Sequence, residues 1–337
     1  MRAVAYKVPQ PISAETSLID VDLPTPEAQG HDLLVEVKAV SVNPVDVKVR
    51  GGLAPAADEL KVLGWDAAGV VKSVGPKVTL FRAGDEVFYS GVINRSGSNA
   101  EFHLVDERIV GHKPKTLDFA SAAALPLTSI TAYEALFDRL RVQDPVSGAA
   151  PAILIIGGAG GVGSIAIQIA RSLTDLTIIA TASRPETSEW IKQLGAHHVV
   201  DHSQPIASQV AALGLGAPGF IFSTTNTDQH ISEIVEVIAP QGRFALIDDP
   251  KALDIMPFKR KAVSTHWELM FTRPLFGTPD MIEQHKLLNR VAELVDAGKI
   301  RTTLSETLGP INAANLKRAH AMIESGRTKG KLVLEGF

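Results

Sequence analysis

Cysteine is absent from all 337 residues of this chain. The absence excludes disulfides, thiolate zinc sites and cysteine nucleophiles. The serine-hydrolase pattern G-x-S-x-G is also missing, so the sequence offers no nucleophile for hydrolysis. Charge is modest, since 33 Lys and Arg stand against 37 Asp and Glu for a formal net charge of −4. Without a dense basic face, we expect neither nucleic acid nor a membrane surface as a partner.

The amino terminus lacks a targeting signal. MRAVAYKVPQ has no apolar core of the kind found in signal peptides, and no uncharged run of membrane-spanning length is free of proline. We therefore expect a cytoplasmic protein. The length, together with 45% hydrophobic residues, predicts two globular domains.

A glycine-rich turn stands near the middle of the chain, between an apolar run and a helical pattern. Residues 153–156 predict a strand buried on both faces, and Ser164–Ser172 predicts a helix. Gly158, Gly160 and Gly163 complete G-x-G-x-x-G between them. This placement predicts a dinucleotide-binding loop in which Gly161 and Val162 also face the pyrophosphate at the helix N-terminus.

The regions before and after this turn differ in their predicted secondary structure. Residues 1–124 contain short strand-like runs separated by glycine and proline, and these predict an antiparallel β-barrel: Arg2–Tyr6, Leu33–Val40, Ala67–Val74, Glu86–Ser90 and Ala100–Val105. Residues 125–272 alternate strands with helices and predict a doubly wound parallel sheet, with strands at 153–156, 176–181, 198–200, 220–223, 243–247 and 262–271. The fold class is thus α/β with a second, barrel domain.

Residues 273–337 predict a return to the first domain. Apolar residues at helical spacing mark Met281–Asp296, and a second helix is predicted at Ala313–Glu324. A last strand, Lys331–Leu334, needs a sheet to join, for which the barrel is the natural host.

Several motifs resemble the medium-chain dehydrogenase/reductase superfamily, specifically its zinc-free quinone oxidoreductase branch. They are SVNPVDVKVRGG (41–52), LGWDAAGVVKSVG (63–75), AGDEV (83–87), GSNAEF (97–102), LPLTSITAYEAL (125–136) and the GGAGGVG loop. The resemblance implies a GroES-like barrel, a Rossmann domain and a nicotinamide cofactor. Proteins of this branch are often labelled zinc-type alcohol dehydrogenase-like.

That label conflicts with the residues at the zinc-ligand positions. By the family motifs the ligand positions correspond to Asn43, Trp65 and Leu127, none of which replaces a thiolate or imidazole. His198 and His202 are four residues apart, but on a strand and its exit this spacing does not bring side chains together. We expect no functional zinc.

The end of the second Rossmann strand favours NADP(H). Ser183 and Arg184 stand where NAD-selective folds carry a carboxylate, and a guanidinium suits a 2′-phosphate. Glu186 is expected on the following helix, with no carboxylate placed to repel the phosphate. The alternative is an exposed surface arginine. The family resemblance adds His202 and Arg327 to the cofactor residues.

Without a Lewis acid, the acceptor is expected to be electron-poor: a quinone or an α,β-unsaturated carbonyl compound. Catalytic candidates are Asn43, Asp46 and Lys48, with Asn43 also near the nicotinamide ribose, and Thr131 and Tyr133 are candidate cofactor contacts. Tyr133 is equally interpreted as a packing residue. Related quinone reductases usually have tyrosine where Lys48 stands, and Lys48 is equally interpreted as a solvated surface lysine.

Two functions therefore stay open: an NADPH-dependent quinone or enone reductase, and a non-catalytic NADPH-binding sensor. The zinc-type label adds an alcohol or aldehyde oxidoreductase as a further alternative. Residues 262–271 (AVSTHWELMF) predict a long apolar edge strand, and the resemblance implies that two such edges pair in a homodimer.

Overall fold

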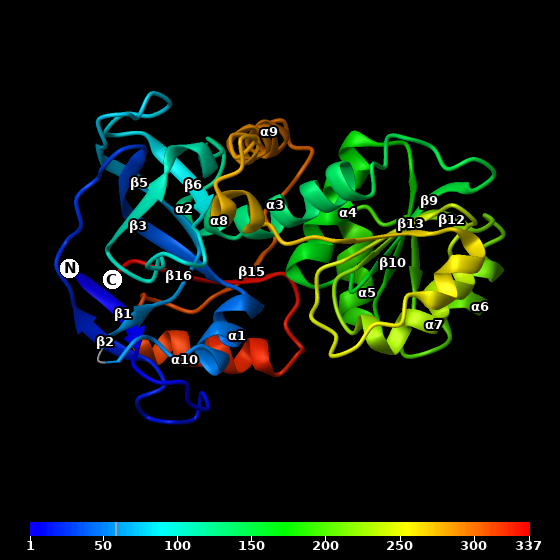
Figure 1. Ribbon diagram of the computed structural model, residues 1–337, viewed down its shortest axis with the longest axis horizontal. Helices are drawn as coiled ribbons and strands as arrows, with labels where there is room; N and C mark the ends of the chain where they lie inside the picture. Colours follow the sequence, from blue (N-terminus) through cyan, green and yellow to red (C-terminus); the bar gives the residue numbers. More distant parts are fainter. Residues whose placement is uncertain (58) are drawn as a thin grey trace. The chain divides into compact units, whose positions relative to one another are not determined.

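The chain forms two compact units. The computed structural model describes residues 1–57 and 59–337. One unit consists of Met1–Ile130 together with Phe271–Phe337, and the other of Thr131–Met270. Figure 1 shows that the first unit contains both ends of the chain, in blue and red, and that the green and yellow middle of the chain makes the second.

The first unit contains two β-sheets, in which most neighbouring strands are antiparallel. Its strands are β1 (Arg2–Tyr6), β2 (Ile19–Asp22), β3 (Asp32–Val42), β4 (Lys61–Val62), β5 (Asp66–Val74), β6 (Glu86–Ser90), β7 (Phe102–Asp106), β8 (Val110–His112), β15 (Leu304–Thr307) and β16 (Lys331–Glu335). The larger sheet has the order β15-β16-β3-β5-β6-β8, with β7 also paired to β3, and the smaller has the order β2-β1-β4. The predicted GroES-like barrel is confirmed.

Helices cover this unit from several parts of the sequence: α1 (Pro44–Gly52), the 3-10 turn η1 (Glu107–Ile109), α2 (Phe119–Ala123), α3 (Pro126–Tyr133), α8 (Thr272–Phe276), α9 (Glu283–Asp296) and α10 (Ala313–Glu324). Helix α3 continues into the second unit. Sequence analysis missed α1, which begins with Pro44 at its first turn, a position that proline favours. Within the described part of the chain, no helix is both long and apolar enough to cross a membrane.

The second unit is a parallel sheet with helices packed against it. Its elements are the π-helical segment η2 (Glu134–Arg139), β9 (Ala150–Ile156), α4 (Gly161–Leu173), β10 (Thr177–Thr181), α5 (Pro185–Gln193), β11 (His198–Val200), α6 (Ile206–Ala212), β12 (Pro218–Ser223), α7 (Thr227–Val237), β13 (Arg243–Leu246), η3 (Met256–Lys261) and β14 (Ser264–Trp267). The strand order β11-β10-β9-β12-β13-β14 reverses between β9 and β12, as in a doubly wound fold. The predicted Rossmann sheet is confirmed.

The core of the second unit lies on the central strands. Leu154, Ile156, Ile221 and Phe244 are fully buried, in one cluster with side chains from α6 and α7. Burying a side chain of this size stabilises a fold by roughly 1.5–3 kcal/mol. The glycine turn after β9 therefore projects from a rigid strand.

The last strand joins the first unit as predicted. β16 pairs antiparallel with β3, with Leu334 opposite Val40. Its first residue, Lys331, carries a buried ammonium whose Nζ lies 3.0 Å from Asp66 Oδ2 at the start of β5. The two side chains are 3% and 0% exposed, so the ion pair is shielded from water.

The predicted edge strand at 262–271 is wrong in its length. Only Ser264–Trp267 pairs with β13. Ala262 before it takes a left-handed conformation with φ of 50° after η3, which ends the strand on that side. After β14, the apolar residues Leu269 and Phe271 do not extend the edge strand. Leu269 is exposed, whereas Phe271 is buried. The homodimer stays a prediction, and it has a shorter edge to pair.

The buried ion pair generates a stability prediction. Lys331→Met should lower the free energy of unfolding by about 3–5 kcal/mol, because it leaves the Asp66 carboxylate buried without its cation. Adding Asp66→Asn should restore part of that loss. Urea unfolding of both single variants and the double variant gives the coupling energy. Lys286→Met, at an exposed lysine paired with Glu283, is the control and should change stability by less than about 1 kcal/mol. Strictly additive losses would contradict the prediction.

Candidate functional site

The glycine turn has the geometry of a phosphate loop. It connects β9 to α4, whose N-cap is Gly160. A Cβ on Gly163 would lie 2.3 Å from the Gly157 carbonyl oxygen, so only glycine fits there. A Cβ on Gly160 would meet its nearest atom at 3.6 Å, so this side of the turn is open. Gly161 and Val162, in the first helical turn, are only partly buried. Their amide groups can therefore receive a pyrophosphate.

Thr181, at the end of β10, connects the glycine turn to His202. Its Oγ1 accepts a hydrogen bond from the Gly157 backbone N–H at 3.0 Å and lies 3.0 Å from His202 Nδ1. The His202 ring faces His230 with centroids 6.1 Å apart. Burial and the neighbouring His230 lower the pKa of His202, which favours a neutral imidazole. Thr181 therefore connects His202 to the glycine turn, and contact of His202 with the cofactor stays a prediction.

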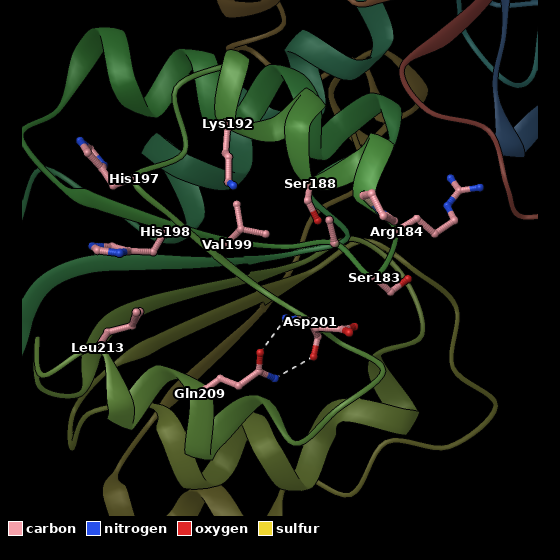
Figure 2. A pocket seen from close by; sticks show the side chains of 12 residues that line it. Ser183, Arg184, Ser188, Lys192, His197, His198, Val199, Asp201, Gln209 and Leu213 are labelled. Atoms are coloured by element: carbon pink, nitrogen blue, oxygen red, sulfur yellow. Dashed lines mark hydrogen bonds between the residues drawn. The ribbon is translucent and has the colours of Figure 1, made fainter.

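A pocket of about 520 Å³ runs from the end of β10 along β11. Its polar lining comes from the β10–α5 connection, from α5, from β11 and the residues on either side of it, and from α6: Ser183, Arg184, Ser188, Lys192, His197, His198, Asp201 and Gln209. Figure 2 shows Ser183 and Arg184 at one end and Lys192 farther along α5. The hydroxyl and cationic side chains at this strand end suit an anionic ligand.

The expectation that no carboxylate stands near Arg184 is wrong. Glu186 lies on α5 as predicted, but its Oε1 is 3.2 Å from Arg184 Nε. The side chains are 38% and 55% exposed, so solvent screens this pair and it stabilises little. To bind a phosphate, the Arg184 guanidinium would have to leave the Glu186 carboxylate or contact both groups at once.

In the first unit, Asn43 lies in a buried polar network. Its Nδ2 donates to Asp66 Oδ2 at 2.8 Å, and its Oδ1 accepts from the Lys331 ammonium. Lys331 also donates to the Val42 carbonyl at 3.2 Å. The Asn43 side chain is therefore held by charged neighbours on both ends of its amide.

Asp46 lies beside Asn43 and holds the backbone around it. Its Oδ2 accepts from the Asn43 N–H at 2.8 Å, and its Oδ1 accepts from the Gly64 N–H at 2.9 Å. Burial raises the pKa of Asp46 to about 7, while the two backbone donors act in the opposite direction. Lys48 follows on α1 but is exposed. The structure thus brings Asn43 and Asp46 together and places Lys48 at the surface.

Two of the three zinc-ligand positions, Asn43 and Leu127, hydrogen-bond to the Asp66 carboxylate. The Leu127 N–H donates to Asp66 Oδ1 at 2.7 Å, and Asn43 contacts the other oxygen. Trp65 is fully buried, with its ring edge-on to Phe271 at 5.9 Å. In residues 1–57 and 59–337 no three metal-ligating side chains gather. The donor set of an amide, an indole and an aliphatic side chain does not fit zinc.

Sequence analysis missed Asp66 and Lys331. Asp66 directly follows Trp65 in LGWDAAG, so a carboxylate next to a ligand position was a visible signal. Lys331 lies 265 residues farther along the chain, and no local pattern indicated that it would meet Asp66.

The remaining candidates fall in different places. Thr131 is buried in α3, and Tyr133 packs on Phe137 with ring centroids 4.5 Å apart. Arg327 is exposed in the connection between α10 and β16. Thr131 and Tyr133 belong to the second unit and Arg327 to the first.

Comparisons with known proteins agree with this fold. Residues 29–115 match the alcohol dehydrogenase GroES-like domain, and residues 194–334 match the family described as zinc-binding dehydrogenase. A zinc-type alcohol dehydrogenase-like protein of Staphylococcus aureus (strain MSSA476) is 41% identical over 313 residues, 92% of each chain.

Two solved structures superpose over the chain. A crystal structure from Rhizobium etli CFN 42, assigned provisionally as a zinc-dependent alcohol dehydrogenase, is 71% identical with a TM-score of 0.99, covering 100% of this chain and 98% of the other. The quinone oxidoreductase of Coxiella burnetii is 26% identical with a TM-score of 0.79, covering 100% and 99%. The chain is thus an oxidoreductase of the medium-chain dehydrogenase/reductase superfamily and belongs to its quinone oxidoreductase-like branch.

Proposed function

We propose that this protein is an NADPH-dependent reductase of quinones or α,β-unsaturated carbonyl compounds that works without zinc. The observation that carries the proposal is the network at the zinc-ligand positions, where Asn43 and the Leu127 N–H both bind the Asp66 carboxylate. A chain with this network has no Lewis acid to polarise an alcohol. It needs an acceptor that is already electron-poor.

The second unit supplies the cofactor residues of this proposal. The amide groups of Gly161, Val162 and Gly163, in the first turn of α4, bind the pyrophosphate. Gly158 and Gly160 donate their N–H groups to the carbonyls of Thr181 and Gly157, so they contribute to the cofactor site by shaping the turn. Ser183 and Arg184 bind the 2′-phosphate, and His202 lies at the same edge of the sheet. Thr131 and, from the first unit, Asn43 and Arg327 complete the proposed cofactor residues. Bound NADPH supplies the hydride.

The first unit supplies the acceptor residues. Lys48 is the exposed cation of α1 and is proposed to stabilise negative charge developing on the acceptor oxygen. Asp46 fixes the turn before the helix through its two backbone hydrogen bonds. The amide of Asn43 is held by Asp66 and Lys331, so this buried side chain is fixed in position.

One observation favours a second function. Asn43 and Asp46 are both buried and satisfied within the protein, which suits a structural role as well as a catalytic one. An NADPH-binding sensor without turnover would keep the same phosphate loop. An alcohol or aldehyde oxidoreductase, the third possibility, would need another way to polarise the hydroxyl.

An acceptor panel distinguishes these functions. We expect the protein to oxidise NADPH with quinones or alkenals, and Lys48→Met to lower kcat/KM by about tenfold, less than the loss from a buried oxyanion donor. Absorbance at the NADPH band measures turnover, and thermal unfolding measures binding. Protection of the fold by NADPH with no oxidation across the panel would favour the sensor. Turnover confined to alcohols and aldehydes would favour the third function.

Cofactor preference tests Arg184. NADPH should bind more tightly than NADH by about 1.5–3 kcal/mol, or roughly ten- to a hundred-fold, as for a charge-assisted contact. Arg184→Asp should abolish this preference, and rising salt should weaken it. Glu186→Gln, which removes the competing carboxylate, should strengthen NADPH binding. Equal wild-type affinities for the two nucleotides, or an unchanged ratio in Arg184→Asp, would reject this role.

Metal content tests the zinc-free assignment. We expect purified protein to contain less than one zinc per chain and to keep its activity after chelation, because no thiolate or imidazole stands at the ligand positions. Elemental analysis and assays before and after a chelator measure both quantities. One tightly bound zinc per chain that turnover requires would refute the assignment.

A further inference from the structure

One face of α5 presents a row of polar side chains to the pocket at the end of β10. Arg184, Ser188 and Lys192 all line this pocket, and they follow one another at intervals of four residues from the N-cap of the helix. Residues four apart lie on the same face of a helix, about 6 Å from one another along its axis. Ser188 therefore stands midway between two cationic side chains, one helical turn from each.

Two members of this row are not engaged by other side chains. In the part of the chain that the structure describes, neither the Lys192 ammonium nor the Ser188 hydroxyl makes a hydrogen bond or an ion pair. Figure 2 shows both side chains extending from α5 toward Val199 of β11, whereas the Arg184 guanidinium extends away from them. An ammonium and a hydroxyl on one wall of a pocket are a pair of donors that suits an oxyanion.

The opposite wall of the pocket is neutral. It comes from α6 and contributes Gln209 and Leu213. The Gln209 amide is already in use, because its Oε1 accepts from the Asp201 N–H and its Nε2 donates to the Asp201 carbonyl, both at 2.8 Å. An anionic ligand in this pocket therefore finds its donors on the α5 side.

Two carboxylates stand near the row, and each has a partner other than Lys192. Glu186 is paired with Arg184, 3.2 Å apart. Asp201 lines the pocket, but its Oδ1 accepts both the N–H and the Oγ–H of Ser203 at 2.8 Å. These two donors hold the pKa of Asp201 below its usual range. Lys192 is thus the cation of the lining whose charge remains for a ligand.

The charge of a phosphate group explains why two cations are needed. A phosphate monoester carries about 1.5 to 2 negative charges at pH 7. One guanidinium that shares a carboxylate does not balance that charge, and Lys192 supplies a second positive charge from the same face of the helix. The pocket, at about 520 Å³, is large enough to enclose a phosphate together with part of the molecule that carries it.

We propose that Ser188 and Lys192 form a phosphate site on α5. The Lys192 ammonium and the Ser188 hydroxyl donate to one phosphate group, and the Arg184 guanidinium reaches it from the N-terminal side. The source of this phosphate is the 2′-phosphate of NADPH, so the inference rests on the proposed NADPH binding. A free phosphate ion is the other source of the same chemistry. Ser188 and Lys192 are then specificity residues for NADPH over NADH, in addition to Ser183 and Arg184.

Cofactor affinities of two α5 variants test the proposal. The dissociation constants of NADPH and NADH are measured by calorimetry for the wild-type protein, Lys192→Met and Ser188→Ala. We expect Lys192→Met to weaken NADPH binding about tenfold and Ser188→Ala about threefold, as for one charge-assisted and one ordinary hydrogen bond. Neither change should alter NADH binding, because NADH lacks the 2′-phosphate.

A lysine outside the pocket provides the matched control. Lys259 is exposed in η3 of the same unit, and Lys259→Met should leave both affinities at their wild-type values. Thermal unfolding without nucleotide should be the same for all variants, since no contact within the protein is lost. An NADPH preference that is unchanged in Lys192→Met, or an equal loss of NADH and NADPH affinity in that variant, would overturn this proposal alone.

Inorganic phosphate separates this proposal from the proposed function. Equal wild-type affinities for NADH and NADPH would overturn the NADPH preference, and a phosphate titration then tests the α5 site by itself. Saturable binding of phosphate that is lost in Lys192→Met and kept in Lys259→Met would support the site, with the free ion as its ligand. Binding that is equal in these two variants, which indicates an adventitious ion only, or no saturable binding, would overturn the site as well.

Discussion

The buried Asp66 carboxylate is the interaction on which the first unit depends. It accepts hydrogen bonds from the Asn43 amide, the Leu127 backbone and the Lys331 ammonium, which belong to three separate parts of the chain. An uncompensated carboxylate at this depth would cost several kcal/mol, by a rough estimate for buried ions. The single ammonium of Lys331 therefore fixes the C-terminal strand, the start of α1 and the first turn of α3 around one charge.

In the proposed zinc-free function, this charged centre takes the structural place of a metal. In the zinc enzymes that the motifs resemble, a metal ties together the segments that correspond to Asn43, Trp65 and Leu127. In this protein the Asp66 carboxylate and the Lys331 ammonium connect the same segments. The consequence is chemical as well as structural, because a saturated ammonium cannot act as a Lewis acid. The electron-poor acceptors proposed above follow from that difference.

The sequence predicted features that depend on local patterns. The glycine turn after β9 was predicted because each glycine has a steric role between neighbouring elements, and the 2.3 Å clash at Gly163 bears this out. The joining of β16 to the barrel followed from a strand that needed a partner. Edge strand β14 was predicted too long, because the apolar letters of Leu269 and Phe271 do not reveal which of them is buried.

Other features of the site depend on distant or fine geometry. Lys331 meets Asp66 from 265 residues away in the sequence. The contact of Glu186 with Arg184 is local, but it depends on how two exposed side chains turn at the start of α5. Such contacts follow from the folded backbone, and residue type alone does not indicate them.

The central claim is that a charged lysine occupies the buried centre of the first unit. Nitrogen-15 nuclear magnetic resonance of the lysine side chains tests it most directly, with Lys331→Met assigning the signal. The account predicts a Lys331 ammonium resonance at pH 7 whose protons exchange with water much more slowly than those of the exposed Lys286. A neutral amine, or exchange as fast as at Lys286, would contradict it.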